Sequence, residues 1–168
     1  MAKKNEKNLE LIVDCDATMP SVLLGDEKKL RRIIMNLVDN AVKFTETGGV
    51  SLRIGYRKEE YGVNLVISVK DTGIGISESN LEKIFTSFNQ VDASRKRQEG
   101  GLGLGLAISN ALIRKMGGAI TIKSKVGKGT VVQVVVPQKV LDETPIAMLQ
   151  DRRAIKVATY IDMEQFDN

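Results

Sequence analysis

Asn36-Leu-Val-Asp-Asn-Ala-Val-Lys-Phe-Thr45 closes a long amphipathic segment that begins after Asp26. The apolar residues of this segment recur at spacings of three and four, which is the pattern of one face of a helix: Leu30, Ile33, Ile34, Leu37, Val38 and Ala41. Asp26 is of a type that commonly caps a helix, and Thr47-Gly-Gly49 follows as a stop signal. The sequence therefore predicts a helix from Asp26 to about Thr47.

A polar stripe runs along the same helix beside the apolar one. Asn36, Asn40 and Lys43 fall within roughly 60° of each other at about 100° per residue. Amide oxygens in such a stripe can complete the coordination of Mg²⁺, and a lysine can reach a phosphate. An ordinary solvated helix flank is the alternative interpretation.

Asp71-Thr-Gly-Ile-Gly75 directly follows an apolar, strand-like run. A carboxylate at the end of a strand can accept a hydrogen bond from an exocyclic amine such as that of adenine. The glycines permit positive φ and a close approach of the backbone to a base. A plain Asp-Thr-Gly turn explains the same residues without a ligand.

Gly100-Gly-Leu-Gly-Leu-Gly-Leu-Ala107 leads into a predicted helix over residues 104–116. Backbone N–H groups freed by glycines at a helix start can cradle phosphate, although a flexible hinge or a close helix contact would use the same residues. A dinucleotide-binding unit is disfavoured because no βαβ context or downstream acidic residue accompanies the glycines. The phosphate-binding loop with the pattern GxxxxGK[ST] is excluded because the string does not occur.

The remaining chain alternates short strands and helices irregularly. Strands are predicted over residues 9–13, 22–24, 50–57 and 63–70, a helix from Ser77 to Phe85, and a hairpin over residues 119–124 and 130–136. This order predicts an α/β fold, a two-layer sandwich of a mixed β-sheet covered on one face by about three helices. Pro137 is expected to close the last strand. We assign residues 1–138 to one domain and residues 139–168 to a linker and the possible first strand, residues 154–162, of a following domain.

Composition limits the class of protein. The chain has 168 residues and a net charge of +4, but its Lys and Arg residues are scattered and only 4% of residues are aromatic, so nucleic-acid binding is not expected. No apolar run is long enough to span or insert into a membrane, and no signal peptide opens the chain. One cysteine, Cys15, suits a reducing compartment, which predicts a cytoplasmic location.

Taken in this order and at these spacings, the three polar and glycine-rich segments resemble the catalytic, ATP-binding domain of sensor histidine kinases, in the GHKL ATPase superfamily and of the hybrid type. The resemblance covers roughly residues 5–138 and implies the Bergerat-type ATP-binding fold, with ATP and Mg²⁺ as cofactors. It implies that Asn36 and Asn40 contact the metal, that Lys43 contacts phosphate, and that Asn40 and Lys43 are the catalytic residues. Asp71 is implied to read the adenine amine.

The other implied nucleotide-binding residues lie in the family's remaining motifs and in a lid over residues 89–101. They are Gly73, Gly75, Phe85, Phe88, Arg97, Gly101, Leu102, Gly103, Leu104 and Gly105. Two residues at the end of the lid depart from the family pattern. Leu102 stands where Thr or Ser is usual, and Glu99 stands where many relatives have an aromatic residue. We expect these changes to weaken or slow nucleotide engagement.

The resemblance also bears on the reaction. Hydrolytic relatives carry a Glu where this chain has Asn36, and an amide is no general base at neutral pH, which favours phosphoryl transfer over hydrolysis. The chain contains no histidine, so the phosphoacceptor is expected on a histidine-bearing dimerisation domain upstream, with a response regulator or receiver domain as a further partner. A serine-phosphorylating relative that controls a sigma factor and a nucleotide-binding regulatory module without phosphotransfer are the alternatives.

Overall fold

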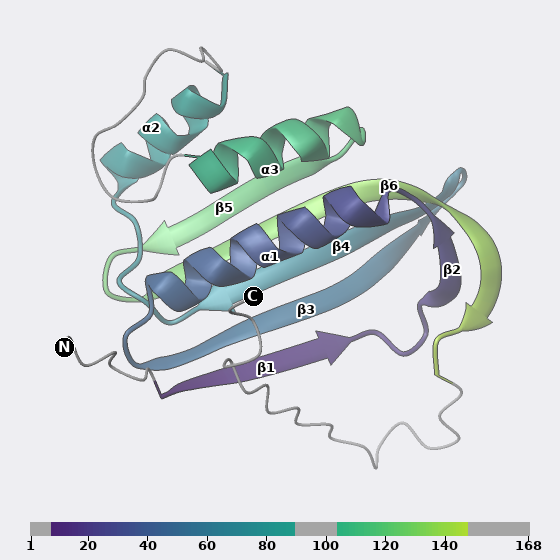
Figure 1. Ribbon diagram of the computed structural model, residues 1–168, viewed down its shortest axis with the longest axis horizontal. Coiled ribbons are helices and arrows are strands. Elements are labelled where there is room, and N and C mark those ends of the chain that lie inside the picture. Colours follow the sequence, from purple (N-terminus) through teal and green to yellow (C-terminus); the bar gives the residue numbers. More distant parts are fainter. Residues whose placement is uncertain (1–7, 90–103, 148–168) are drawn as a thin grey trace.

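The protein forms two layers, a twisted sheet with helices lying across one of its faces (Figure 1). This computed structural model describes residues 8–89 and 104–147. The described elements comprise one six-stranded sheet and three helices, in the order β1-β2-α1-β3-β4-α2-α3-β5-β6. The predicted α/β sandwich, with a mixed sheet and helices on one face, is confirmed.

The sheet is built around β4, a strand of ten residues from Gly62 to Asp71. Strand order is β1-β3-β4-β6-β2, and β5 also pairs with β6. β1 runs parallel to β3 and the other pairs are antiparallel. The bounds of the other strands are β1 Leu9–Cys15, β2 Pro20–Leu24, β3 Gly48–Glu59, β5 Ala119–Lys125 and β6 Gly129–Pro145.

β6 is longer than the sequence predicted. Pro137 was expected to end it, yet the strand continues to Pro145, and Pro137 itself pairs with Asn64 of β4. A proline cannot donate to a ladder, but it is tolerated where one side of the strand has no neighbour. β5 pairs with β6 only as far as Val135, and the pairing of β2 with β6 begins only at Lys139, so Pro137 falls in the gap between the two neighbours.

The helices are α1 Glu27–Lys43, α2 Glu78–Asn89 and α3 Leu104–Lys115. The predicted cap of α1 is confirmed, since Asp26 Oδ1 accepts the Lys29 N–H at 3.0 Å. α1 ends at Lys43, before the predicted Thr47-Gly-Gly49 stop, because the Thr45 hydroxyl donates to the Ala41 carbonyl at 2.7 Å, the acceptor that a continuing helix would use. α2 continues four residues beyond Phe85.

The core lies between the helices and the sheet. In β4 every second residue is buried, Val63, Leu65, Ile67 and Val69, as the alternation predicted. α1 packs Ile33, Leu37 and Ala41 against this face. α3 adds Leu106 and Ile113, which draws α1 and α3 together over the sheet. Among the described residues, no helix is long and apolar enough to cross a membrane.

Candidate functional site

Asp71 is the last residue of β4, and its side chain is only 8% exposed. Its Oδ1 atom accepts two backbone N–H groups, from Gly73 at 2.9 Å and from Thr130 at 3.1 Å. No described residue forms a hydrogen bond with Oδ2. The carboxylate is thus fixed through one oxygen, and the other can accept a hydrogen bond from a ligand amine.

Burial raises the pKa of Asp71 above its usual value of 3.8. The hydrogen bonds from Gly73 and Thr130 act in the opposite direction, because they stabilise the charged form, but they are outweighed. The site therefore holds a carboxylate whose desolvation has a free-energy cost. A carboxylate that is buried at such a cost and held by two backbone N–H groups is a candidate binding residue.

The glycines after Asp71 are required by contacts within the protein. A Cβ atom on Gly73 would lie 2.2 Å from the Phe44 carbonyl oxygen, and one on Gly75 would lie 2.1 Å from the Lys125 carbonyl oxygen. Gly75 also has a φ of +70°. The loop is held at the end of α1 by the Ile74 N–H, which donates to the Phe44 carbonyl at 3.1 Å.

The turn between β5 and β6 supports the same loop, a role the sequence did not indicate. Gly129 has a φ of +89°, and a Cβ there would lie 2.0 Å from the Asp71 carbonyl oxygen. This close approach brings the Thr130 N–H to the carboxylate. The sequence predicts only a hairpin turn at residues 125–129, and Gly129 is the residue in it that signals the close passage of another backbone.

The polar stripe of α1 meets the start of α3. Asn36 Nδ2 donates to the Gly105 carbonyl at 3.4 Å and to Ser109 Oγ at 3.2 Å. A Cβ on Gly105 would lie 3.8 Å from Asn36 Oδ1 and 4.0 Å from Asn40 Nδ2. The structure thus brings Asn36, Asn40 and Gly105 together, although they come from two segments far apart in the sequence.

Lys43 lies one turn further along α1 and is exposed. Its Nζ atom is 5.4 Å from the centroid of the Phe44 ring, within range of a cation–π contact. The ammonium group stands at the end of α1, where the Asp71 loop is also attached through Phe44. The Asn36 and Asn40 amides and the Lys43 ammonium group therefore lie along the second half of α1. The buried carboxylate of Asp71, at the end of β4, belongs to the loop that is attached to the end of this helix.

Several predicted nucleotide-binding residues lie outside the described part of the chain. These are Arg97, Gly101, Leu102 and Gly103, together with Glu99 and the rest of the expected lid from residue 90. Phe85 and Phe88 lie in α2, and Leu104 begins α3. Their backbones are helical, as predicted for Phe85 and Leu104, and their side chains are not described.

The described residues can contribute to a Mg²⁺ site but cannot form one alone. They contain no group of three or more His, Cys, Asp or Glu side chains that could hold a metal. They do offer two neighbouring amides, Asn36 and Asn40, beside a glycine that leaves space in front of them. Mg²⁺ commonly takes few protein ligands together with substrate phosphates, so this donor set fits a metal that is held jointly with a nucleotide.

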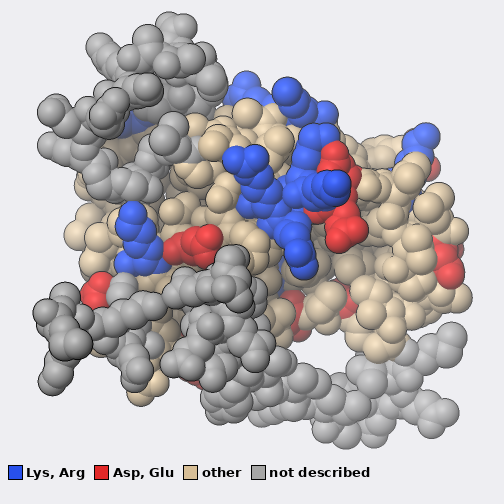
Figure 2. All heavy atoms as spheres, viewed as in Figure 1, with Lys and Arg blue, Asp and Glu red and all other residues tan. Residues whose placement is uncertain are grey.

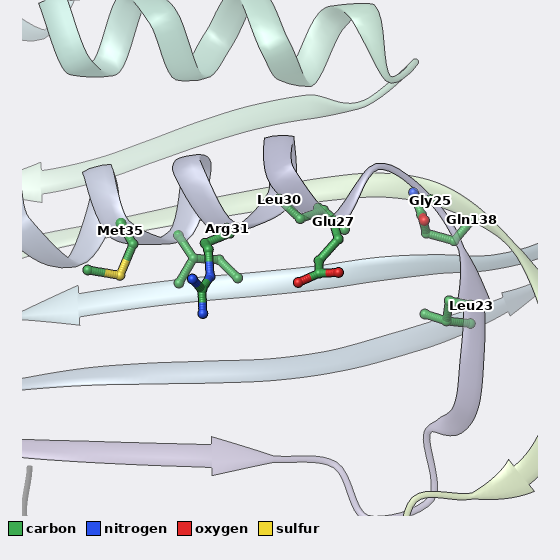
Figure 3. A pocket seen from close by; sticks show the side chains of 8 residues that line it. Leu23, Gly25, Glu27, Leu30, Arg31, Met35 and Gln138 are labelled. Atoms are coloured by element: carbon green, nitrogen blue, oxygen red, sulfur yellow. The ribbon is translucent and has the colours of Figure 1, made fainter.

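A separate hollow of about 530 Å³ lies between the first half of α1 and the end of β2 (Figure 3). Its lining residues are Leu23, Gly25, Glu27, Leu30, Arg31, Ile34, Met35 and Gln138. None of the predicted site residues is among them. Figure 2 shows Lys and Arg side chains gathered over this part of the molecule. The exposed basic residues of α1 include Lys28, Arg31 and Arg32.

Comparison with known sequences agrees with the geometry. A sequence model of the histidine kinase-, DNA gyrase B- and HSP90-like ATPase family matches residues 25–140. The chain therefore belongs to this ATPase family, as a catalytic domain of the histidine kinase type.

Its relatives include the hybrid signal transduction protein dokA of Dictyostelium discoideum, which is 45% identical over 132 residues, and the sensor histidine kinase GacS of Pseudomonas protegens, 45% identical over 125 residues. These matches cover 75% and 74% of this chain but only 8% and 14% of the relatives. The chain thus spans a small part of the curated proteins that it matches.

Solved structures show the same fold. Full-length ShkA in complex with AMPPNP has a TM-score of 0.65 and 35% identity, over 81% of this chain and 27% of that one. The mycobacterial sensor histidine kinase MprB has a TM-score of 0.59 and 27% identity, over 79% of this chain and 84% of that one.

Proposed function

We propose that this domain binds ATP together with Mg²⁺ and transfers the γ-phosphoryl group to a histidine on a separate helical domain. The observation that carries the proposal is the arrangement along α1. A buried carboxylate lies at the end of the helix, with one oxygen that no described residue engages in a hydrogen bond, and Asn36, Asn40 and Gly105 converge one to two turns earlier. The AMPPNP complex of ShkA, a relative in fold and sequence, supports a nucleotide at such a site.

Each residue has a role in this proposal. Asp71 Oδ2 accepts the adenine amine, and Gly73 and Thr130 hold the carboxylate in place. Lys43 attracts the phosphates, and Asn36 and Asn40 supply the amide ligands of the metal. Bound Mg²⁺ would neutralise charge on the phosphates. Gly75, Gly101, Gly103, Phe85, Phe88, Arg97, Leu102 and Leu104 complete the proposed nucleotide site.

Catalysis would rest on positioning and charge neutralisation. Asn36 cannot remove a proton from water, so the site lacks the base that hydrolysis needs at this position. A phosphoryl group in line with a presented imidazole needs no such base, because the neutral ring nitrogen is itself the nucleophile. We therefore propose transfer to a protein acceptor.

The chain contains no histidine, so the acceptor is proposed on a histidine-bearing dimerisation domain, in the cytoplasm where ATP is available. A response regulator or receiver domain would receive the group next. That the named relatives are hybrid and sensor kinases supports both partners.

The test is to incubate the chain with labelled ATP, Mg²⁺ and the helical region that precedes it in the full-length protein. An acid-labile, base-stable phosphoprotein is expected, and Asn40→Ala should abolish its formation. Acid-stable phosphoserine would favour the serine-phosphorylating alternative. Nucleotide binding without any transfer would favour the regulatory module.

A further inference from the structure

Ser109 is fully buried beneath the polar stripe of α1. Its exposed fraction is 0%, and its Oγ atom accepts the Asn36 side-chain N–H at 3.2 Å. Ser109 comes from the second turn of α3, whereas Asn36 comes from the middle of α1. A part-buried side-chain hydrogen bond therefore joins the two helices immediately beside the amides of the proposed metal site.

The same contact fixes which way the Asn36 amide is turned. The second acceptor of Asn36 Nδ2 is the Gly105 carbonyl, at 3.4 Å, and a carbonyl oxygen can only accept. The amide nitrogen must therefore be the atom that meets both acceptors, and the oxygen Oδ1 takes the other position, 3.8 Å from where a Cβ on Gly105 would lie. An amide that rotated by 180° would place two oxygens against each other at Gly105.

From these contacts we infer that Ser109 is a positioning residue for the Mg²⁺-supported binding of nucleotide. It holds Asn36 with its carboxamide oxygen, the atom that Mg²⁺ prefers, presented to the ligand side. This inference rests on the proposed function, because it assigns Ser109 a role only if the Asn36 amide contributes to a metal site. Ser109 itself touches neither the metal nor the nucleotide.

The test measures ATP affinity by calorimetry twice for each variant, once with Mg²⁺ and once with EDTA. In Ser109→Ala the Asn36 nitrogen loses its shorter hydrogen bond, so Mg²⁺-supported affinity should fall about three- to tenfold. The affinity in EDTA should remain as in the wild type. An unchanged affinity with Mg²⁺, or an equal loss in both conditions, would overturn the inference.

A double-mutant cycle separates positioning from a general packing effect. If Ser109 acts through Asn36, then Ser109→Ala should have no further effect on Mg²⁺-supported affinity in an Asn36→Ala background. Additive losses would contradict the proposed coupling. Ser109→Cys keeps the shape of the side chain with a somewhat larger atom and offers only a weak acceptor, so it should repeat the Mg²⁺-specific loss even if the alanine variant unfolds.

The wild-type measurements test the proposed function independently. If the wild-type protein failed to bind ATP in either condition, the proposed function itself would fail. If it bound ATP with a Mg²⁺ dependence that Ser109→Ala and Ser109→Cys left intact, only the role of Ser109 would be wrong.

Discussion

The Thr130 N–H of β6 donates a 3.1 Å hydrogen bond to Oδ1 of Asp71, a residue 59 positions earlier in the chain. Together with the Gly73 N–H at 2.9 Å, it occupies one carboxylate oxygen and orients the other. Asp71 is therefore held by two strands and a loop, and the oxygen that no described residue contacts by a hydrogen bond is fixed before any ligand arrives. Such preorganisation reduces the conformational entropy that binding must overcome.

Asp71→Asn should reduce ATP affinity by about 10- to 100-fold. The two backbone N–H groups require an acceptor, so the amide oxygen of the new Asn would take the place of Oδ1 and its nitrogen the place of Oδ2. Two hydrogen-bond donors, this nitrogen and the exocyclic amine of adenine, would then face each other. Calorimetry with Mg-ATP measures the effect. Asp142→Asn is a matched control, because Asp142 on β6 likewise accepts a backbone N–H, from Thr144 at 2.9 Å, and it should bind ATP normally. Near-wild-type affinity of Asp71→Asn would contradict the adenine contact.

Nucleotide binding should weaken in acid at a pH above 3.8, because burial raises the pKa of Asp71 and the protonated group no longer offers a charged acceptor. The same shift has the opposite effect on the empty protein. Since the folded-state pKa exceeds the unfolded one, the stability that Asp71 contributes is fully present below pH 3.8 and is lost as pH rises through the folded-state pKa.

Asp71→Asn removes this titration. Denaturant unfolding of the empty proteins as a function of pH should therefore show the variant gaining stability relative to the wild type as pH rises through this window. A constant difference between the two proteins over the whole pH range would show that Asp71 does not have a raised pKa.

Gly105→Ala should separate stability from binding. A Cβ at this position would make ordinary contacts, 3.8 Å from Asn36 Oδ1 and 4.0 Å from Asn40 Nδ2, so the helix can accept it. Alanine in place of a helical glycine stabilises by up to about 1 kcal/mol, which thermal unfolding would show. Because the methyl group fills the space in front of the two amides, Mg²⁺-supported ATP affinity should fall. Gly55→Ala, on β3, is the control that should leave affinity unchanged.

Gly73→Ala should lower both stability and nucleotide affinity. The new Cβ would lie 2.2 Å from the Phe44 carbonyl oxygen and 2.9 Å from Thr45 Oγ1, so the loop must move away from α1 at a cost of about 1–3 kcal/mol. Gly117→Ala, just after α3, provides the comparison, because it adds a methyl group at a positive φ of +72° with only an ordinary contact, to Pro137 Cγ at 3.5 Å. That variant should lose some stability while its affinity stays unchanged. Equal ATP affinity of the two variants would show that the Asp71 loop tolerates displacement.

The sequence was sufficient for the layers of the fold. Apolar periodicity predicts which face of each element is buried, and it is a local property of that element. This holds for the spacing of Ile33, Leu37 and Ala41 in α1 and for the alternation in β4. The adjacency of Asn36, Asn40 and Gly105 followed from a family resemblance. The spacing along α1 alone was equally compatible with a solvated flank.

The contacts that fix the site were not predictable in the same way. The hydrogen bond from Thr130 to Asp71 depends on the register of β6 against β4, and no local pattern specifies a pairing across 59 residues. The Ser109 contact depends on how α3 packs across α1. The continuation of β6 past Pro137 was missed because tolerance of a proline depends on whether a neighbouring strand is present, which is a property of the sheet.

The length of β6 also determines where the rest of the chain leaves this domain. The strand begins at Gly129, against Asp71, and ends at Pro145, beside Pro20 of β2, at the other end of the sheet (Figure 1). Its 17 residues correspond to up to roughly 50 Å of extended strand. Whatever follows Pro145 is therefore tethered far from the proposed adenine contact. A receiver domain connected there would start at the end of the sheet opposite the proposed nucleotide site, so it would not occupy the space that the histidine-bearing domain needs in order to reach the γ-phosphoryl group.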